Sequence, residues 1–327
     1  MDVQPSGNTL LICVTGRLFV DSEQQPQRYS QVFLLSQSGT NFYILNDVFR
    51  LNYASAYVLN SVYLRLNFWS IHILLMGLLV LMLAALILLV FCVKARNGIV
   101  DLWRDKSILL VIAHPDDEVL FFGPTLVRGS KIANFHILCL TSGDSAGIGW
   151  IRKRELVRSL EQLGITNTEK ISIIDDPGSL PDGFTCAWDL EKAAKIIEEH
   201  IFKWNIEILI SFDHMGVSGH PNHISSSQAC GLVAVRTDNV PFYSLYSLND
   251  FSFWPLNVVC KYSGMVYAVL KSFIIRDLVL LSPYEYLFTL VPSMQRHRSQ
   301  MVWFRKLYIV FSCYMFCNIY HKIKVKE

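Results

Sequence analysis

The stretch ILLVIAHPDDE, residues 108–118, joins an aliphatic run directly to a cluster of histidine and acidic side chains. Three similar apolar runs bounded by turn residues follow, at 135–140, 171–174 and 206–211. Each run is typical of a strand buried on both faces. Helical patterns lie between the runs, at 118–129, 152–163 and 188–204. Alternating strands and helices predict an α/β fold with a parallel, doubly wound, Rossmann-like sheet covered by helices.

Polar residues follow the first and the fourth of these predicted strands. The first is followed by HPDDE at 114–118, and the fourth by Asp213 and then GHPNH at 219–223. In open α/β sheets, ligands bind beyond the carboxyl ends of the strands, where the strand order reverses. If the first and fourth strands are neighbours, the two polar segments face each other across one crevice.

The residue types in these two segments suit metal-assisted hydrolysis. His114, Asp117 and His223 could supply the three imidazole and carboxylate ligands of a catalytic zinc, leaving a position for water. Asp116 lies beside them as a general base for that water, and His220 is placed to stabilise the oxyanion of the tetrahedral intermediate. Fe²⁺ accepts the same ligands as Zn²⁺, so the ligand set does not decide the metal.

Other interpretations of these residues stay open. Asp116 and Asp117 also suit the start of the following helix, and His220 and His223 could be surface histidines. A serine triad is disfavoured, because the chain has no GxSxG elbow and Ser142 has no evident base. The glycine-rich stretch that begins there lacks the GKS/T of a phosphate loop and predicts a mobile active-site loop.

Residues 71–93 predict a single transmembrane helix. Between Arg65 and Lys94 there is no Asp, Glu, Lys or Arg, and about 20 apolar residues cross a bilayer. A buried core helix is the alternative, but such helices rarely run this long without a polar face. Basic residues are more frequent after the segment than before it, which places everything after residue 94 in the cytosol.

Composition excludes some functions and supports this arrangement. The chain has 327 residues with 29 Lys and Arg against 27 Asp and Glu, so it carries no field that would attract nucleic acid. A hydrophobic content of 52% is high for a soluble enzyme and suits a chain that is partly in lipid. The eight cysteines form no CxxC pair, which fits a reducing compartment rather than a disulfide framework.

The chain after the predicted span divides into three parts. Residues 94–106 read as a linker, residues 107–240 as the catalytic core and residues 241–327 as a membrane-proximal or substrate-binding extension. Within the extension, residues 294–308 interleave basic and aromatic side chains, which suits the headgroup zone of a bilayer and a phosphodiester. A core-packed extension with snorkelling basic side chains is an equal alternative.

The segments described above resemble the zinc-dependent, LmbE-like de-N-acetylases, and among them the N-acetylglucosaminylphosphatidylinositol de-N-acetylase family of glycosylphosphatidylinositol anchor synthesis. The resemblance covers residues 107 to about 313. It is carried by AHPDDE at 113–118, TSG at 141–143, RKREL at 152–156, LGI at 163–165, FDHMGVSGHPNH at 212–223 and HRSQMVWFRKLY at 297–308.

The resemblance implies a role for each matched residue. It implies zinc ligation by His114, Asp117 and His223, general-base catalysis by Asp116, oxyanion stabilisation by His220, and substrate contacts by Arg152, Asp213 and Asn222. A solvated helix face is the alternative for Arg152. Asn222 replaces the Asp of many relatives and adds no negative charge, which leaves the tuning of His220 open.

The function implied is hydrolysis of N-acetylglucosaminyl-phosphatidylinositol to the glucosaminyl lipid and acetate. The family implies a single-pass protein of the endoplasmic reticulum membrane with its catalytic domain facing the cytosol. The expected partners are the glycolipid and the membrane. The sequence identifies neither protein partners, nor oligomeric state, nor the acyl preference of the lipid. A deacetylase of a soluble N-acetylglucosaminide is an alternative that the predicted span disfavours.

Residues 9–53 carry a second resemblance, to the final strands of nuclear transport factor 2. GRL, the QVF run and NDVFRLNY occur in that family's order, and the alternating apolar residues predict an antiparallel meander within residues 1–60. The helices and first strands of that family are missing, so a fragment with open edges is not expected to be stable alone. A binding or transport adaptor that works through this segment is the competing function.

Overall fold

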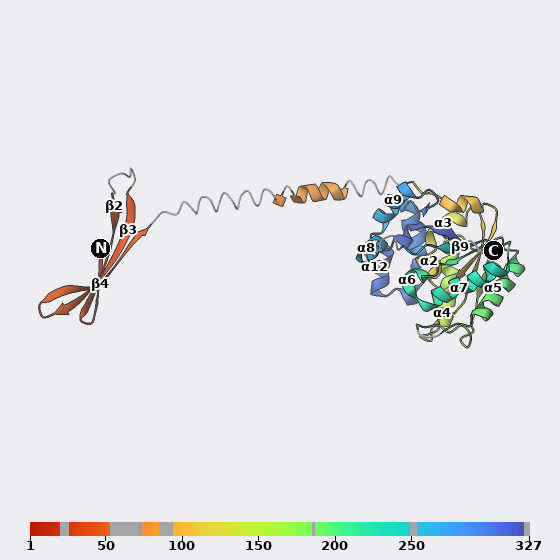
Figure 1. Ribbon diagram of the computed structural model, residues 1–327, viewed down its shortest axis with the longest axis horizontal. Helices are drawn as coiled ribbons and strands as arrows, with labels where there is room; N and C mark the ends of the chain where they lie inside the picture. The colour runs from red at the N-terminus through yellow and green to blue at the C-terminus, as the bar shows by residue number, and fades with distance from the viewer. Residues whose placement is uncertain are drawn as a thin grey trace. The chain divides into compact units, whose positions relative to one another are not determined.

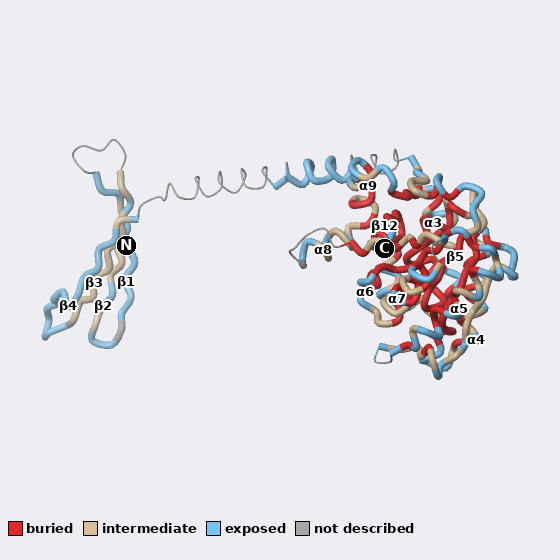
Figure 2. Tube along the Cα trace, turned by 45° about the vertical axis from the view of Figure 1, so that its right-hand side comes forward, coloured by how far each residue is buried: buried red, intermediate tan, exposed pale blue. Residues whose placement is uncertain are grey.

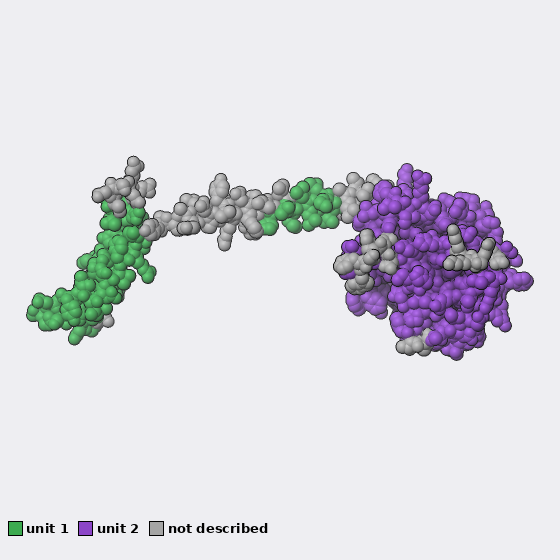
Figure 3. Space-filling model, in the orientation of Figure 1, with its two compact units in different colours: residues 1–83 green, residues 84–327 purple. Residues whose placement is uncertain are grey.

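The computed structural model describes residues 1–19, 26–52, 72–73, 75–84, 94–184, 187–237, 239–248 and 254–323. The chain divides into two compact units, Met1–Leu83 and Ala84–Glu327 (Figure 3).

The first unit contains a four-stranded antiparallel sheet. Its strands are β1 (Asp2–Ser6), β2 (Thr9–Leu18), β3 (Gln27–Ser38) and β4 (Asn41–Asn52), paired in chain order. The register shifts between Leu34 and Leu35, where β3 pairs with β4. The predicted meander is confirmed. Almost every residue of β4 is exposed, because no described helix covers this sheet.

Residues 72–73 and 75–84 are helical, and their side chains are exposed wherever the structure describes them. Within the described part of the chain, no helix combines the length and the apolar character needed to cross a membrane. Residues 71, 74 and 85–93 of the predicted span lie outside the described residues.

The second unit is built on a six-stranded sheet in the order β12-β9-β8-β5-β6-β7. The strands are β5 (Ser107–Ile112), β6 (Asn134–Cys139), β7 (Ile171–Ile173), β8 (Ile208–Phe212), β9 (Phe242–Leu245) and β12 (Tyr320–Lys322). Five strands run parallel, whereas β12 pairs antiparallel with β9. The predicted parallel sheet is confirmed for the four predicted strands, and the structure adds β12, which makes the sheet mixed at this edge. The edge strand comes from the end of the chain and needs no crossover helix, an arrangement common in large α/β sheets.

Strand β5 occupies the centre of this sheet. Its residues from Ile108 to Ile112 are at most 1% exposed, which confirms a strand buried on both faces. It pairs with β6 on one side and with β8 on the other. The strand order reverses between β5 and β8, so the predicted adjacency of the first and fourth strands is confirmed.

Most predicted helices form, with one break. The main helices of this part are α2 (Asp117–Leu120), α3 (Gly123–Gly129), α4 (Gly149–Gln162), α5 (Leu190–Trp204), α6 (Gly216–Gly219) and α7 (Pro221–Arg236), with short η1 (Gly98–Trp103) and η2 (Thr168–Lys170). The predicted helix 118–129 divides into α2 and α3, because Phe122 leaves the helical conformation and Pro124 starts a new helix. Helices α5 and α7 pack against each other and against the central strands.

Residues 254–323 fold onto the same unit. They form α8 (Trp254–Lys261), α9 (Met265–Ile274), β10 (Val279–Leu280), α10 (Pro283–Glu285), η3 (Tyr286–Leu290), α11 (Val291–Met294), η4 (Arg298–Gln300), α12 (Trp303–Phe311), η5 (Cys313–Met315) and β11 (Cys317–Asn318). Strands β10 and β11 pair with each other. Helices α8, α9 and α12 lie together on one side of the unit, away from α5 (Figure 1). The buried residues gather around the large sheet (Figure 2).

Candidate metal centre

The turn after β5 holds its acidic residues by hydrogen bonds to its own backbone. Oδ2 of Asp117 accepts hydrogen bonds from the backbone N–H of Ala113 at 3.1 Å and of His114 at 2.8 Å. Asp116 has φ of 139°, a backbone conformation that only glycine adopts readily. Its N–H donates to Oε2 of Glu118 at 2.9 Å. The fold therefore holds Asp116 in a strained conformation beside the site.

The loop after β8 brings His223 to the same place. Its Nε2 lies 3.2 Å from Oδ1 of Asp117, and its Nδ1 lies 3.1 Å from the carbonyl oxygen of Gly216. Its ring stacks on Phe212 with centroids 4.2 Å apart. The Gly216 carbonyl accepts a hydrogen bond only from Nδ1–H, so in the neutral ring the lone pair of Nε2 points towards Asp117.

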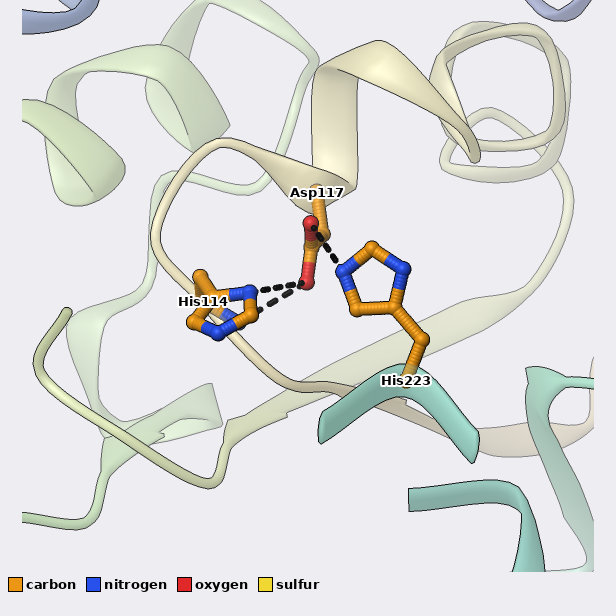
Figure 4. Close-up of side chains that lie close together, drawn as sticks. All are labelled: His114, Asp117 and His223. Carbon is orange, nitrogen blue, oxygen red and sulfur yellow. Dashed lines mark hydrogen bonds and ion pairs between the residues drawn. The ribbon is translucent and has the colours of Figure 1, made fainter. Parts of the chain in front are cut away.

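His114, Asp117 and His223 each offer a ligand atom, and these atoms all lie within 4.8 Å of one another (Figure 4). All three residues are buried, at the carboxyl ends of the adjacent strands β5 and β8. Two imidazoles and a carboxylate are a donor set that zinc accepts at catalytic sites. The geometry thus fits a metal ion held by the three predicted ligands, whose role as ligands remains a prediction.

A second carboxylate, Asp182, supports His114. Nε2 of His114 lies 3.1 Å from Oδ1 of Asp182, and its Nδ1 lies 3.6 Å from Oδ2 of Asp117. Burial lowers the pKa of His114, but hydrogen bonds to these two carboxylates outweigh it and raise the pKa to about 9. The site therefore attracts a cation, either a proton or a metal ion.

Sequence reasoning missed Asp182. It lies in the loop after the third strand, at the same edge of the sheet as the predicted residues. Functional residues are expected directly after strands, whereas Asp182 lies nine residues beyond the end of β7, so the sequence pattern did not indicate it.

Asp116 lies between two guanidinium groups. Nη2 of Arg152 is 3.4 Å from Oδ1 of Asp116, and Nη1 of Arg305 pairs with Oδ2. Arg152 is buried and also donates to the carbonyl oxygens of Gly143 at 2.9 Å and Pro115 at 3.0 Å. The alternative of a solvated helix face for Arg152 is therefore wrong. Arg305 belongs to the basic and aromatic segment that the sequence assigned to headgroup contacts, and its pairing with Asp116 had no signal in the sequence.

His220 is held as a neutral donor. Burial, together with the neighbouring His114 and His223, lowers its pKa to about 4. Its Nδ1 accepts a hydrogen bond from the backbone N–H of Asn222 at 3.2 Å, so the remaining proton sits on Nε2. The neutral ring therefore presents an N–H that can donate a hydrogen bond to an oxyanion.

The other two predicted substrate contacts lie behind the site. Nδ2 of Asn222 is 3.1 Å from Nε2 of His114. Asp213 accepts hydrogen bonds from the backbone and hydroxyl of Ser247, at 2.7 and 2.6 Å, and from the N–H of Met215 at 3.1 Å. Neither Asn222 nor Asp213 is among the residues that line the pocket described next, so their contact with substrate stays a prediction.

A pocket of about 920 Å³ opens over the candidate ligands. Its polar end consists of the three candidate ligands together with Asp116, Arg152, Asp182, His220 and Arg305. Its other walls are mainly apolar and come largely from α12, with Trp303, Phe304, Leu307, Tyr308 and Phe311. A polar reaction end and a long apolar wall suit an amphiphilic substrate.

Fold and site together define an α/β protein with a candidate metallohydrolase centre at the switch point of its sheet. The family model described as GlcNAc-PI de-N-acetylase matches residues 109–233. A probable N-acetylglucosaminyl-phosphatidylinositol de-N-acetylase of Schizosaccharomyces pombe is 35% identical, over 65% of this chain and 86% of its own. The enzyme of that name from Bos taurus is 33% identical, over 64% of this chain and 81% of its own. The chain belongs to the N-acetylglucosaminyl-phosphatidylinositol de-N-acetylase family.

Two further similarities concern other proteins. The nuclear transport factor 2 domain model matches residues 1–51, and nuclear transport factor 2 of Schizosaccharomyces pombe is 54% identical over 16% of this chain. That match spans 45% of the relative, less than half of its length. N,N'-diacetylchitobiose deacetylase from Pyrococcus horikoshii is similar in structure with a TM-score of 0.42 and 15% identity, over 70% of this chain and 87% of its own.

Proposed function

We propose that this chain hydrolyses the acetamide of N-acetylglucosaminyl-phosphatidylinositol, in glycosylphosphatidylinositol anchor biosynthesis. The observation that carries the proposal is the cluster of His114, Asp117 and His223, with Asp116 beside it, at the end of a pocket with a long apolar wall. The names of the relatives supply the substrate.

The three candidate ligands would hold Zn²⁺, or Fe²⁺ where that is the metal supplied. When bound, such an ion polarises the acetyl carbonyl and lowers the pKa of water. The remaining chemistry belongs to the side chains around it. Asp182 and the Gly216 carbonyl orient the two ligand imidazoles, which is the usual function of groups one layer behind a metal.

Asp116 is proposed to take the proton of the attacking water and to return it to the departing amine. Water adds to the acetyl carbon, the C–N bond breaks, and the products are acetate and the free amine of glucosamine. The guanidinium groups of Arg152 and Arg305 hold both oxygens of Asp116 in place. His220 lines the pocket, and its Nε2–H is proposed to donate to the oxyanion as it forms.

We also propose a membrane location. Residues 71–93 would cross the bilayer of the endoplasmic reticulum once, with the catalytic unit on the cytosolic side. The apolar sequence of this segment and the basic residues after it support the proposal. The competing adaptor hypothesis for the N-terminal segment remains untested.

The test is acetate release from the glycolipid by the purified, detergent-solubilised full chain. Asp116→Asn keeps the size of the side chain and should lower kcat by at least about 100-fold, the usual contribution of a general base. Asp101→Asn, at an exposed aspartate on η1, is the matched control and should retain full activity. Chelation should abolish release, and added Zn²⁺ or Fe²⁺ should restore it. Full activity of Asp116→Asn or of His223→Ala would refute the mechanism.

A further inference from the structure

We propose that the chain docks onto an anionic lipid bilayer through one apolar face of its catalytic unit, so that the pocket opens into the headgroup layer. The apolar face is formed by α8, α9, η3 and α12. The inference deepens the proposed function, because a glycolipid substrate must reach the pocket from a bilayer. The surface itself is argued from chemistry that does not depend on catalysis.

The face exposes an unusual set of large apolar side chains. They include Val259 of α8, Phe273 and Ile274 of α9, Phe288 of η3, and Trp303 and Phe304 of α12. Phe273 and Trp303 are 71% and 73% exposed. Such residues are normal singly, but a gathering of them marks an interaction surface.

The elements that carry these residues adjoin one another. The hydroxyl of Tyr286 in η3 donates to the carbonyl oxygen of Ile309 in α12 at 2.8 Å. Gly264, which separates α8 from α9, faces the backbone of Val310 in α12 so closely that a Cβ there would lie 3.1 Å from the carbonyl oxygen. Figure 1 shows α8, α9 and α12 on the same side of the unit. The exposed side chains therefore belong to one surface.

The charge of these helices selects a bilayer as the occupant. Helices α8, α9 and α12 contain no Asp or Glu, and among their basic residues Lys306 is exposed and Lys271 is half-buried. Their other two basic residues are engaged within the unit, because Lys261 donates to the carbonyl oxygen of Val217 and Arg305 pairs with Asp116. Basic residues beside aromatic ones suit a surface of anionic headgroups, where each basic residue near the surface contributes about fivefold to binding. A second copy of the chain would bring like charges together across a two-fold interface, which opposes pairing.

The pocket opens in this face. Trp303 and Phe304 line the pocket and are also exposed, at 73% and 53%. Arg305, between them and the reaction end, lies partly buried against Asp116. A glycolipid can thus keep its acyl chains near the bilayer while its sugar enters the pocket. The lipid then moves only a short distance out of the membrane.

The test is quenching of tryptophan fluorescence by brominated phosphatidylcholine in vesicles that also contain phosphatidylserine, with the full chain reconstituted. Trp303 is one of seven tryptophans, so its emission is the difference between the wild type and Trp303→Phe. Trp150, 63% exposed at the start of α4, gives the matched control through Trp150→Phe. We expect the Trp303 emission to be largely quenched and the Trp150 emission to be unchanged.

Two further variants separate docking from anchoring. Phe273→Asp on α9 should weaken the quenching of Trp303, whereas Phe202→Asp, at an 87% exposed residue of α5, should not. Asp116→Asn should be quenched like the wild type, because docking needs no turnover; quenching without acetate release would thus count against the proposed function alone. Unquenched Trp303 emission, or equal quenching of Trp303 and Trp150, would overturn the proposal. Unquenched emission together with cross-linked dimers through Phe273→Cys would assign the face to a second copy instead.

Discussion

Replacing His297 tests whether the C-terminal segment, residues 297–305, holds the turn after β5, residues 113–118, in place. Nε2 of His297 lies 2.6 Å from Oε1 of Glu118, and both side chains are fully buried. The other oxygen of Glu118 accepts the N–H of Asp116, so the pair supports the strained residue proposed as the base. His297→Leu would leave a carboxylate buried without its partner.

Removing one member of a buried ion pair costs about 3–5 kcal/mol, because the remaining charge stays desolvated. For a domain of this size each kcal/mol lowers Tm by about 2–4 °C, so His297→Leu should lower Tm by about 6–20 °C. His297→Gln keeps a hydrogen-bond donor and should lose less. Glu118→Gln combined with His297→Leu contains no unpaired charge and should recover part of the loss.

The assay is thermal unfolding of the full chain in detergent micelles, followed by circular dichroism, with acetate release measured on the same samples. His297→Leu should also lower kcat, because Glu118, which accepts the N–H of Asp116, loses the partner that holds it in place. The reasoning is refuted if His297→Leu unfolds within about 2 °C of the wild type, or if the double variant is as unstable as the sum of the single ones.

Three further outcomes are expected. Asp182→Asn should weaken zinc binding about 10- to 100-fold in competition with a chromogenic chelator, and unchanged affinity would exclude its role behind the metal. Gly143→Ala should lower kcat more than Gly147→Ala, because both have positive φ but only the first adds a Cβ that overlaps Arg152; equal rates would refute this. Burial lowers the pKa of His297, but the charge of Glu118 outweighs burial, so the pKa is raised in the folded protein. The stabilisation by the His297–Glu118 pair should therefore be complete below about pH 6.5 and disappear as pH rises through the folded pKa. A difference in Tm between the wild type and His297→Gln that does not change with pH would contradict this.

The sequence predicted the part of the fold that depends on local patterns. Buried strands such as β5 consist of consecutive aliphatic residues, and the polar segments directly after β5 and β8 lie at one edge of the sheet because parallel strands end there. His114, Asp117 and His223 were therefore predicted from their residue types and their positions after these strands, and they lie together.

The rest depends on long-range packing that no local pattern encodes. The antiparallel strand β12 pairs residues 320–322 with β9, about 77 positions earlier in the chain. Arg305 contacts Asp116 across 189 positions, and its neighbouring aromatic residues suggested a headgroup contact instead. Asp182 lies in a long loop, so its distance from His114 follows from the path of that loop and not from its spacing.

Three long-range contacts of the C-terminal segment share one physical cause. The carboxylates of Asp116, Glu118 and Glu155 are buried, and a buried carboxylate requires a hydrogen-bond donor. Residues 297–305 supply one donor to each of these carboxylates: His297 donates to Glu118, Ser299 to Glu155 at 2.6 Å, and Arg305 to Asp116. Without that segment each of these carboxylates would lose the donor that residues 297–305 supply. The turn after β5 and the C-terminal segment must therefore fold together. A chain truncated before residue 297 should lose both stability and the geometry of Asp116.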